Sequence, residues 1–189
     1  MVIPYRHDQR RDITQQFTDS DEALGWLEQE LPNLASAVRF AADHGYPAMA
    51  WQIVDALWPL FLRRGHYRER LELDQVGLAA ARASGDATAE AKMLNRFGLA
   101  LIKLGRLDEA AGCFRQALAI WRGAGSDYRV ASSLRRLGLI ERARNRTERA
   151  LALFMRALDG VRVAGDRELA SGFGQYFHTL LTVMKYLTR

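Results

Sequence analysis

The 189-residue sequence contains a single cysteine and no long apolar run. Because Cys113 has no second cysteine, it cannot form an internal disulfide or a cysteine-based metal cluster, and we interpret it as a small buried apolar residue. No stretch approaches the roughly 20 apolar residues that a membrane span needs. The first residues also lack the apolar run of a secretion signal. We therefore expect a cytoplasmic protein that does not enter the membrane.

The motifs of common catalytic sites are also missing. No glycine leads into the Gly-Lys-Ser/Thr triplet of a phosphate-binding loop, and there is no Gly-x-Ser-x-Gly elbow. The four histidines lie far apart without an i, i+4 pair, which disfavours a zinc site. We interpret His66, directly after Gly65, as a solvated turn residue. The sequence thus predicts a protein that is not an enzyme and that uses no cofactor or metal; a pocket that holds a small molecule for chemistry is the less favoured alternative.

Proline is confined to the first 59 residues, which leaves the remaining 130 free to form uninterrupted helices. Two helical stretches, 21–30 and 33–38, are expected to meet at Pro32, with Asp19 or Ser20 capping the first. Pro47 suits the first turn of a helix, where its missing N–H costs nothing. Pro59 falls inside a predicted helix and should bend it.

The dominant positive feature is a repeat of 40 residues. Glycines recur at Gly45, Gly85, Gly125 and Gly165, and a second set of turn formers lies 20 residues out of phase, at Gly65, Gly105 and Asn145. Glycine and asparagine tolerate the left-handed conformation in which helices often end. Asp86 and Asp166, each directly after one of these glycines, can cap the next helix. Each unit is therefore predicted to hold two helices and two turns, as in repeat proteins.

Apolar residues recur at three- and four-residue steps on both sides of Gly105, first as Leu94, Phe97, Leu101 and Leu104, then as Leu107, Ala110, Ala111, Phe114 and Ala117. Each helix thus carries one apolar stripe, which a single hairpin cannot bury. Stacking of successive hairpins removes these stripes from water, at about 25 cal/mol per Å² of apolar surface. The predicted fold is all-α and built from stacked helix hairpins.

When the units are aligned by the 40-residue period, small and aromatic residues recur at the same positions. Gly98 aligns with Gly138, Ala110 with Ala150, Phe114 with Phe154, and Ala117-Leu118 with Ala157-Leu158. We expect the small residues to let the helices of a hairpin approach, and the phenylalanines to fill the gap to the next helix. This pattern resembles the tetratricopeptide repeat. The resemblance implies a right-handed superhelix of antiparallel helix hairpins with a C-terminal capping helix.

The unit 51–90 departs from this pattern, because Trp58 stands at the position of Gly98 and Arg70 at that of Ala110. We interpret it as a degenerate repeat. The predicted organisation is an N-terminal arm, 1–18, and one repeat domain, 19–189, divided into a degenerate repeat 19–50, repeats 51–90, 91–130 and 131–170, and an end helix 171–189. That end helix is apolar nearly all round, so it is expected to pack on a partner or a second copy unless the chain is part of a longer array.

The net charge of +5 is concentrated in residues 131–150, which hold six arginines against two glutamates. The tetratricopeptide resemblance implies that the first helix of each hairpin lines a concave groove. The residues at the positions that tend to face it are Gln52, Asp55, Arg63, Lys92, Asn95, Arg96, Ile102, Lys103, Arg135, Arg136, Arg142, Gln175 and Tyr176. Arginine, lysine and amide side chains suit the carboxylates and backbone amides of an extended acidic peptide.

Two other interpretations of this basic face remain open. Its charges can simply solvate an exposed surface, as charged helix faces usually do. They can also contact nucleic-acid phosphates, although the lack of interleaved exposed aromatics and of a base-reading motif disfavours nucleic acid as the partner.

A second resemblance rests on the spacing of Glu22-Ala23-Leu24, Trp26-Leu27, Glu30 and Asn33-Leu34, then Leu57-Trp58, Phe61 and Arg64-Gly65, and finally Gly105-Arg106 with Glu109-Ala110. Over about residues 20–170 the chain resembles the C-terminal repeat region of actinobacterial antibiotic-regulatory transcription regulators of the signal-transduction ATPase class. This implies a sensor or autoinhibitory module that binds a protein, peptide or inducer. The sequence therefore predicts a non-catalytic binding module, with self-association through residues 171–189 as the alternative.

Overall fold

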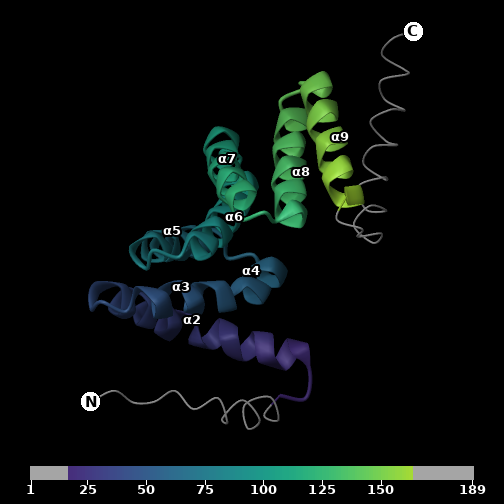
Figure 1. The fold of residues 1–189 in the computed structure, drawn as a ribbon. Coiled ribbons are helices and arrows are strands. Elements are labelled where there is room, and N and C mark those ends of the chain that lie inside the picture. Colours follow the sequence, from purple (N-terminus) through teal and green to yellow (C-terminus); the bar gives the residue numbers. More distant parts are fainter. Residues whose placement is uncertain (1–16, 164–189) are drawn as a thin grey trace.

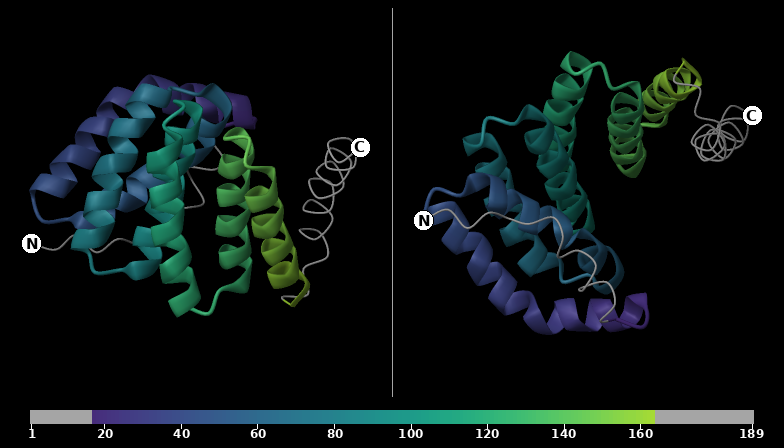
Figure 2. Two further views of the ribbon diagram at one scale, coloured as in Figure 1. Left: turned by 90° about the horizontal axis from the view of Figure 1, so that it is seen from above. Right: turned by 60° about the horizontal axis from the view of Figure 1, so that its bottom comes forward.

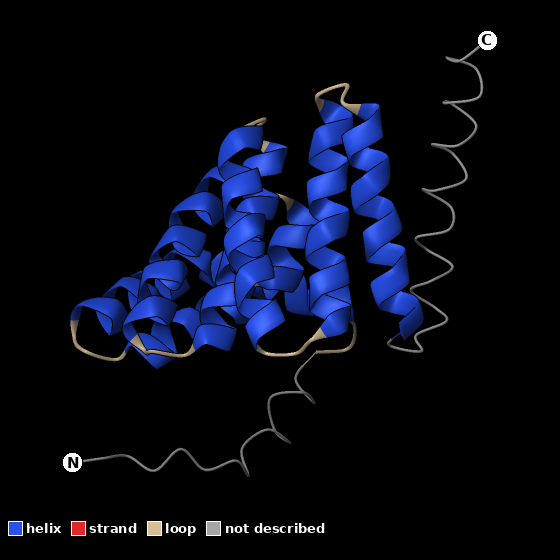
Figure 3. Ribbon diagram, turned by 45° about the horizontal axis from the view of Figure 1, so that its top comes forward, coloured by secondary structure: helices blue, strands red, loops and turns tan. Residues whose placement is uncertain are grey.

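The computed structural model describes residues 17–163, and all regular structure in that range is helical (Figure 3). The prediction of an all-α fold is confirmed. In chain order the helices are α2 (Ser20–Asp43), α3 (Pro47–Ala56), α4 (Trp58–Arg64), α5 (Tyr67–Ala83), α6 (Ala87–Lys103), α7 (Leu107–Gly123), α8 (Asp127–Ala143) and α9 (Thr147–Val163).

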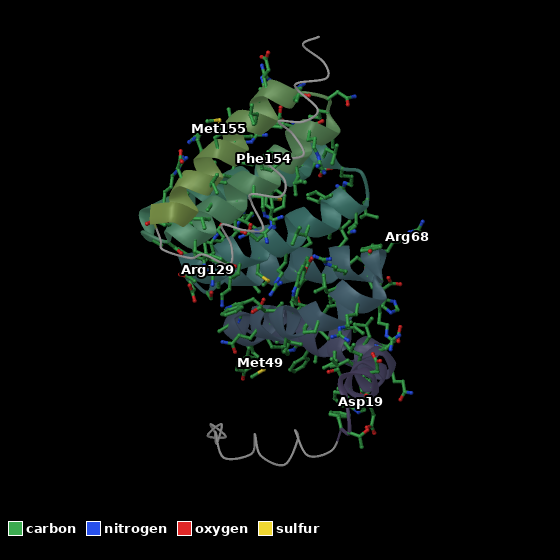
Figure 4. The ribbon with its side chains drawn as sticks, turned by 90° about the vertical axis from the view of Figure 1, so that its right-hand side faces the viewer. Asp19, Met49, Arg68, Arg129, Phe154 and Met155 are labelled. Atoms are coloured by element: carbon green, nitrogen blue, oxygen red, sulfur yellow. The ribbon has the colours of Figure 1, made fainter. Side chains whose placement is uncertain are left out.

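The helices form hairpins that stack one after another, from α2 at one end to α9 at the other (Figure 1). Helix α3 pairs with α5, α6 with α7, and α8 with α9, while α5 packs on α6, α7 packs on α8, and the short α4 contacts α2 and α3. The stack is curved, as Figure 2 shows from two further directions. Arg68 lies near the start of α5, the second helix of its hairpin, and Arg129 near the start of α8, the first helix of its hairpin. The two residues lie on opposite edges of the array (Figure 4), as expected when the two helices of each hairpin run antiparallel.

The 40-residue period is kept by the helix boundaries themselves. The first helices begin at residues 47, 87 and 127 and the second helices at 67, 107 and 147. Each hairpin therefore starts four residues before the unit boundaries 51, 91 and 131 that the sequence alignment used.

The turn residues have the positive φ angles that the period predicts. The φ angles lie between +66° and +90° at five glycines, Gly45, Gly65, Gly85, Gly105 and Gly125. Asn145 occupies the equivalent turn of the last hairpin with a φ of 59°. His66 also has a positive φ, 43°, which the sequence did not indicate. Gly165 and Asp166 lie outside the described residues.

The predicted helix starts are confirmed where the structure describes them. The Asp19 carboxylate accepts hydrogen bonds from the N–H groups of Asp21 and Glu22 at 2.9 and 2.8 Å. The Asp86 carboxylate accepts from the N–H of Ala89 at 3.0 Å. Pro47 is the first residue of α3. These contacts satisfy N–H groups that a helix leaves unpaired at its start.

Two predictions about proline are wrong. Helix α2 runs without interruption through Pro32, because Leu31 and Val38 on either side are buried in the core and hold both halves in place. Pro59 does not merely bend a helix. Helix α3 ends at Ala56 and α4 begins at Trp58, with Pro59 in the first turn of α4, where its lack of an N–H is tolerated.

The phenylalanines pack differently from the prediction. A Cβ added to Gly98 would lie 2.8 Å from the Phe114 ring, and one added to Gly138 would lie 2.9 Å from the Phe154 ring. Each ring therefore lies on the glycine of its own hairpin, where we had expected it to fill the gap to the next helix. Only glycine leaves room for this contact, which sets the spacing between the two helices of the hairpin.

The stack begins with an apolar hollow between α2 and α3. Phe40, Tyr46 and Met49 are more than half exposed there. Forty residues later, the counterparts of Phe40 and Met49 are Ala80 and Ala89, which are buried. This difference is the expected edge effect of an array, since internal hairpins are covered on both sides and the first described hairpin on one.

A basic cavity on the first helices

The first helices enclose a polar cavity of about 330 Å³. Helix α3 contributes one residue, α6 four and α8 four, and the full set is Asp55, Lys92, Asn95, Arg96, Leu99, Tyr128, Arg129, Ser132 and Arg136. We call this the basic cavity, because four of these residues are cationic and one is a carboxylate. It lies between hairpins, where stacking positions residues that are far apart in the sequence.

One cross-hairpin hydrogen bond recurs along the wall of the cavity. The Arg96 guanidinium donates to the Asp55 carboxylate from Nη2 at 3.0 Å and from Nε at 3.2 Å. One hairpin later, Arg136 Nη1 donates to the side-chain oxygen of Asn95 at 3.2 Å. Both pairs are 41 residues apart, so the geometry repeats while the acceptor changes from a carboxylate to a neutral amide.

Behind Arg96 lies a buried charged cluster in the degenerate hairpin. Arg70 Nε donates to the Asp74 carboxylate at 3.1 Å, and Arg70 Nη2 donates to the backbone carbonyl of Arg96 at 2.9 Å. The Trp58 ring lies against both guanidinium groups, 3.8 Å from that of Arg96 and 4.7 Å from that of Arg70. Burial raises the pKa of Asp74 to about 6, and the charge of Arg70 offsets only part of that effect.

Arg136 differs from Arg96 in having no carboxylate partner among the residues that the structure describes. Its Nε atom is buried without a hydrogen-bond partner, and its guanidinium lies 5.7 Å from the centre of the Phe114 ring. Burial, together with the positive charges of Arg135, Arg96 and Arg129, lowers the pKa of Arg136 to about 10. The positive charge at this position is therefore poorly compensated by the protein.

Two further cations of the cavity rest on tryptophan rings. The Lys92 ammonium is 5.8 Å from the centre of the Trp51 ring, and the Arg129 guanidinium is 4.5 Å from that of Trp121. Within the described part of the chain, neither side chain has an ion-pair partner. The aromatic rings orient both cations but do not neutralise them.

The structure brings together five of the residues that the sequence assigned to the groove, namely Asp55, Lys92, Asn95, Arg96 and Arg136. Gln52, Arg63, Lys103 and Arg142 are exposed and do not line the cavity, and neither do the half-buried Ile102 and Arg135. Gln175, Tyr176 and the predicted end helix 171–189 lie outside the described residues. The assignment of these side chains to partner binding stays a prediction.

Sequence reasoning missed Leu99, Tyr128, Arg129 and Ser132. The first turn of α8 lies before residue 131, the first residue of the predicted repeat 131–170, so groove positions counted from that residue do not include Tyr128 and Arg129. The signal was available in the period, because Asp127 follows Gly125 as Ala87 follows Gly85.

His66 has a structural role that the sequence did not indicate. Its Nε2 lies 2.5 Å from a carboxylate oxygen of Glu28, so the side chain joins the start of α5 to α2. His66 is thus a turn residue, as predicted, but its side chain is only 29% exposed and is held by Glu28. Over residues 17–163, no three His, Cys, Asp or Glu side chains gather in a way that could hold a metal ion.

Comparisons with known proteins agree with the geometry. Residues 89–162 match the tetratricopeptide repeat family. Among solved structures, BtubC (BKLC) from P. vanneervenii has a TM-score of 0.58 at 18% identity, with 94% of this chain and 87% of that chain covered. MamA has a TM-score of 0.51 at 15% identity, with 86% of this chain and 99% of that chain covered. The fold is tetratricopeptide-like.

A search of curated proteins finds none that matches this sequence. The tetratricopeptide repeats of residues 89–162 belong to a class that mediates protein–protein interactions through concave surfaces and is typically non-catalytic. None of the helices in the described range is long and apolar enough to span a membrane.

Proposed function

We propose that the chain is a non-catalytic tetratricopeptide module that binds an acidic segment of a protein or peptide in the basic cavity. The observation that carries this proposal is the charge balance of the lining, in which Lys92, Arg96, Arg129 and Arg136 face a single carboxylate, Asp55. Because Arg96 already binds Asp55, three cations remain for a ligand.

The donors in the cavity suit an extended peptide. Guanidinium groups bind carboxylates through two N–H groups at once, and the amide of Asn95 and the hydroxyls of Tyr128 and Ser132 can bind peptide N–H and C=O groups. The cavity lies on the face of the stack to which α3, α6 and α8 contribute. An extended peptide can lie along this face.

We further propose that the module is the cytoplasmic sensor part of a transcription regulator. The support is the sequence resemblance over residues 20–170, with its Trp26-Leu27 and Asn33-Leu34 spacing. The test is the gene itself: an ATPase domain encoded in the same or the adjacent reading frame supports this role, and a gene neighbourhood without any such domain contradicts it.

Peptide binding is tested by fluorescence anisotropy with a short labelled peptide of glycine, alanine and glutamate, and with the same peptide carrying lysine for glutamate. The variant is Lys92→Glu with Arg129→Glu, because neither residue has an ion-pair partner within residues 17–163 whose loss would disturb the fold. Arg96→Glu is less suitable, since it would place a carboxylate beside Asp55.

We expect the native chain to bind the acidic peptide and the double variant to lose that binding, with its helical circular dichroism unchanged. The matched control is Arg122→Glu together with Arg149→Glu, which changes the net charge equally at exposed positions outside the cavity. Equal binding of the acidic and basic peptides, or equal loss in the control, would reject the proposal.

Nucleic acid is tested in the same assay as a second ligand class, because Tyr128 is an aromatic residue 48% exposed beside the cations. A labelled single-stranded oligonucleotide replaces the peptide. Preference for the oligonucleotide, lost on Tyr128→Ala, would assign the cavity to base stacking and phosphate binding.

A further inference from the structure

The two cross-hairpin hydrogen bonds differ in a single charge. In the first, Arg96 is neutralised by Asp55; in the second, Arg136 meets the neutral amide of Asn95. Because the two pairs share the same spacing and similar distances, the second is a version of the first with its counter-ion removed. An anionic ligand can supply the charge that Asn95 lacks.

The surroundings of Arg136 leave that charge uncompensated. Arg129 and Lys92 line the same cavity without an ion-pair partner among the described residues, and the Nε of Arg136 is buried without an acceptor. Gathering three such cations is unfavourable unless a ligand carries the opposing charge. A ligand with more than one negative charge balances them better than a single carboxylate.

The neutral groups of the lining add hydrogen-bond donors. The hydroxyls of Tyr128 and Ser132 belong to α8, and the amide N–H group of Asn95 belongs to α6. A phosphate monoester offers three acceptor oxygens and about two negative charges at neutral pH. Its size is well within a cavity of about 330 Å³.

We infer that the basic cavity binds a phosphate monoester, carried by a phosphorylated side chain of the peptide that lies along the first helices. This inference rests on the proposed function for the peptide, while the anion site itself depends only on Arg136, Arg129 and Lys92. The guanidinium of Arg136 and the cations beside it bind the phosphate oxygens. Asn95 leaves Arg136 available because its amide does not neutralise the guanidinium.

The decisive variants exchange the two acceptors. Asn95→Asp gives Arg136 the carboxylate partner that Asp55 gives Arg96, with little change of shape. We expect it to weaken phosphate binding by about tenfold or more, since a charged hydrogen bond is lost and a like charge is added. Asp55→Asn, the reciprocal change, removes the carboxylate from the cavity and should tighten phosphate binding.

Two measurements use defined probes at constant ionic strength. Inorganic phosphate is titrated into the full chain by calorimetry, with acetate as the carboxylate probe. The labelled acidic peptide is then compared with a version that carries one central phosphoserine. We expect saturable binding of phosphate over acetate, tighter binding of the phosphopeptide, and loss of both preferences in Arg136→Gln and Arg129→Gln. Arg122→Gln is the control, and circular dichroism verifies the fold of every variant.

The outcomes separate this inference from the proposed function. If the acidic peptide binds but phosphate shows no preference over acetate, the phosphate site is wrong and peptide binding stands. Phosphate binding without binding of either peptide supports the anion site and rejects the peptide. If the native chain and the folded Asn95→Asp variant bind phosphate with equal affinity, the inference is overturned.

Discussion

Arg70 and Asp74 form an ion pair one turn apart on α5, with 3% of each side chain exposed. By the 40-residue period these positions correspond to Ala110 and Phe114, and Trp58 corresponds to Gly98. In the next hairpin a phenylalanine ring packs on a glycine, with an alanine one turn away. In the degenerate hairpin the Trp58 ring lies between the guanidinium groups of Arg70 and Arg96 instead. Its stability depends on how a buried charge is compensated, whereas that of the next hairpins depends on close packing.

Replacing Arg70 by alanine should destabilise the fold by about 3–5 kcal/mol at neutral pH, because the buried Asp74 would lose its ion-pair partner and would have to take up a proton or stay charged without compensation. Unfolding in urea measures the change. The control is Arg106→Ala, which removes an exposed pair with Glu109 at 2.7 Å and should change the stability much less, because water screens that pair. Similar losses of unfolding free energy in the two variants would show that the buried ion pair stabilises the fold no more than the exposed one.

The stability of the chain should rise on mild acidification because of Asp74. Its pKa is about 6 in the folded state against 3.8 ordinarily, since burial disfavours the carboxylate. Between about pH 7 and pH 4 the folded state therefore binds a proton that the unfolded chain does not, so the free energy of unfolding increases as the pH falls, by at most about 3 kcal/mol.

Asp74→Asn supplies the control for this pH dependence, because asparagine keeps an acceptor for Arg70 but cannot titrate. Urea unfolding of both proteins at pH 7, 6 and 5 measures the difference. The native chain should gain stability relative to Asp74→Asn as the pH is lowered. A relative loss would mean that the carboxylate is preferred in the folded state.

Gly98→Ala should destabilise the chain by about 1–3 kcal/mol, since the new Cβ would lie 2.8 Å from the fully buried Phe114 ring. Gly112→Ala is the matched control in the partner helix α7, where an added Cβ has nothing within 4 Å. That change should stabilise by up to about 1 kcal/mol through helix propensity. Thermal unfolding distinguishes the two, and Phe114→Leu should partly rescue Gly98→Ala.

The single thiol should react slowly in the folded protein. Cys113 is 8% exposed, and burial raises the pKa of its thiol above the ordinary value. Because the thiolate is the reactive form, labelling by a disulfide reagent at neutral pH should be at least about tenfold slower than in urea. Equal labelling rates in buffer and in urea would show that the α6–α7 hairpin opens readily. Gly112→Ala is the control variant, which should leave the labelling rate of the folded protein unchanged or lower.

The helices and turns of this fold could be predicted because they follow from local chemistry. Gly105 and its counterparts end helices whatever surrounds them, since only a residue without Cβ adopts that φ freely. The prolines could not be assigned so easily. Whether Pro32 interrupts a helix depends on the burial of Leu31 and Val38, which is a property of the packed array.

The candidate site was only partly predictable for a related reason. Lys92 and Arg96 follow from the phase of α6, but Tyr128 and Arg129 depend on where α8 begins. The sequence does not show that Arg136 lacks a counter-ion among the described residues, because the charge balance of the cavity is set by three helices together. The sequence shows which residues are charged, and the stacking decides which of them are left uncompensated.

The repeated hydrogen bond has a consequence for the length of the array. If the 40-residue unit 87–126, hairpin and following turn, were duplicated in tandem, Asn95 of one copy would accept a hydrogen bond from Arg96 of the next, as it now does from Arg136. Each added copy would bring one more guanidinium held by a neutral amide. Elongation by duplication would therefore build up positive potential along the inner wall in proportion to the number of copies.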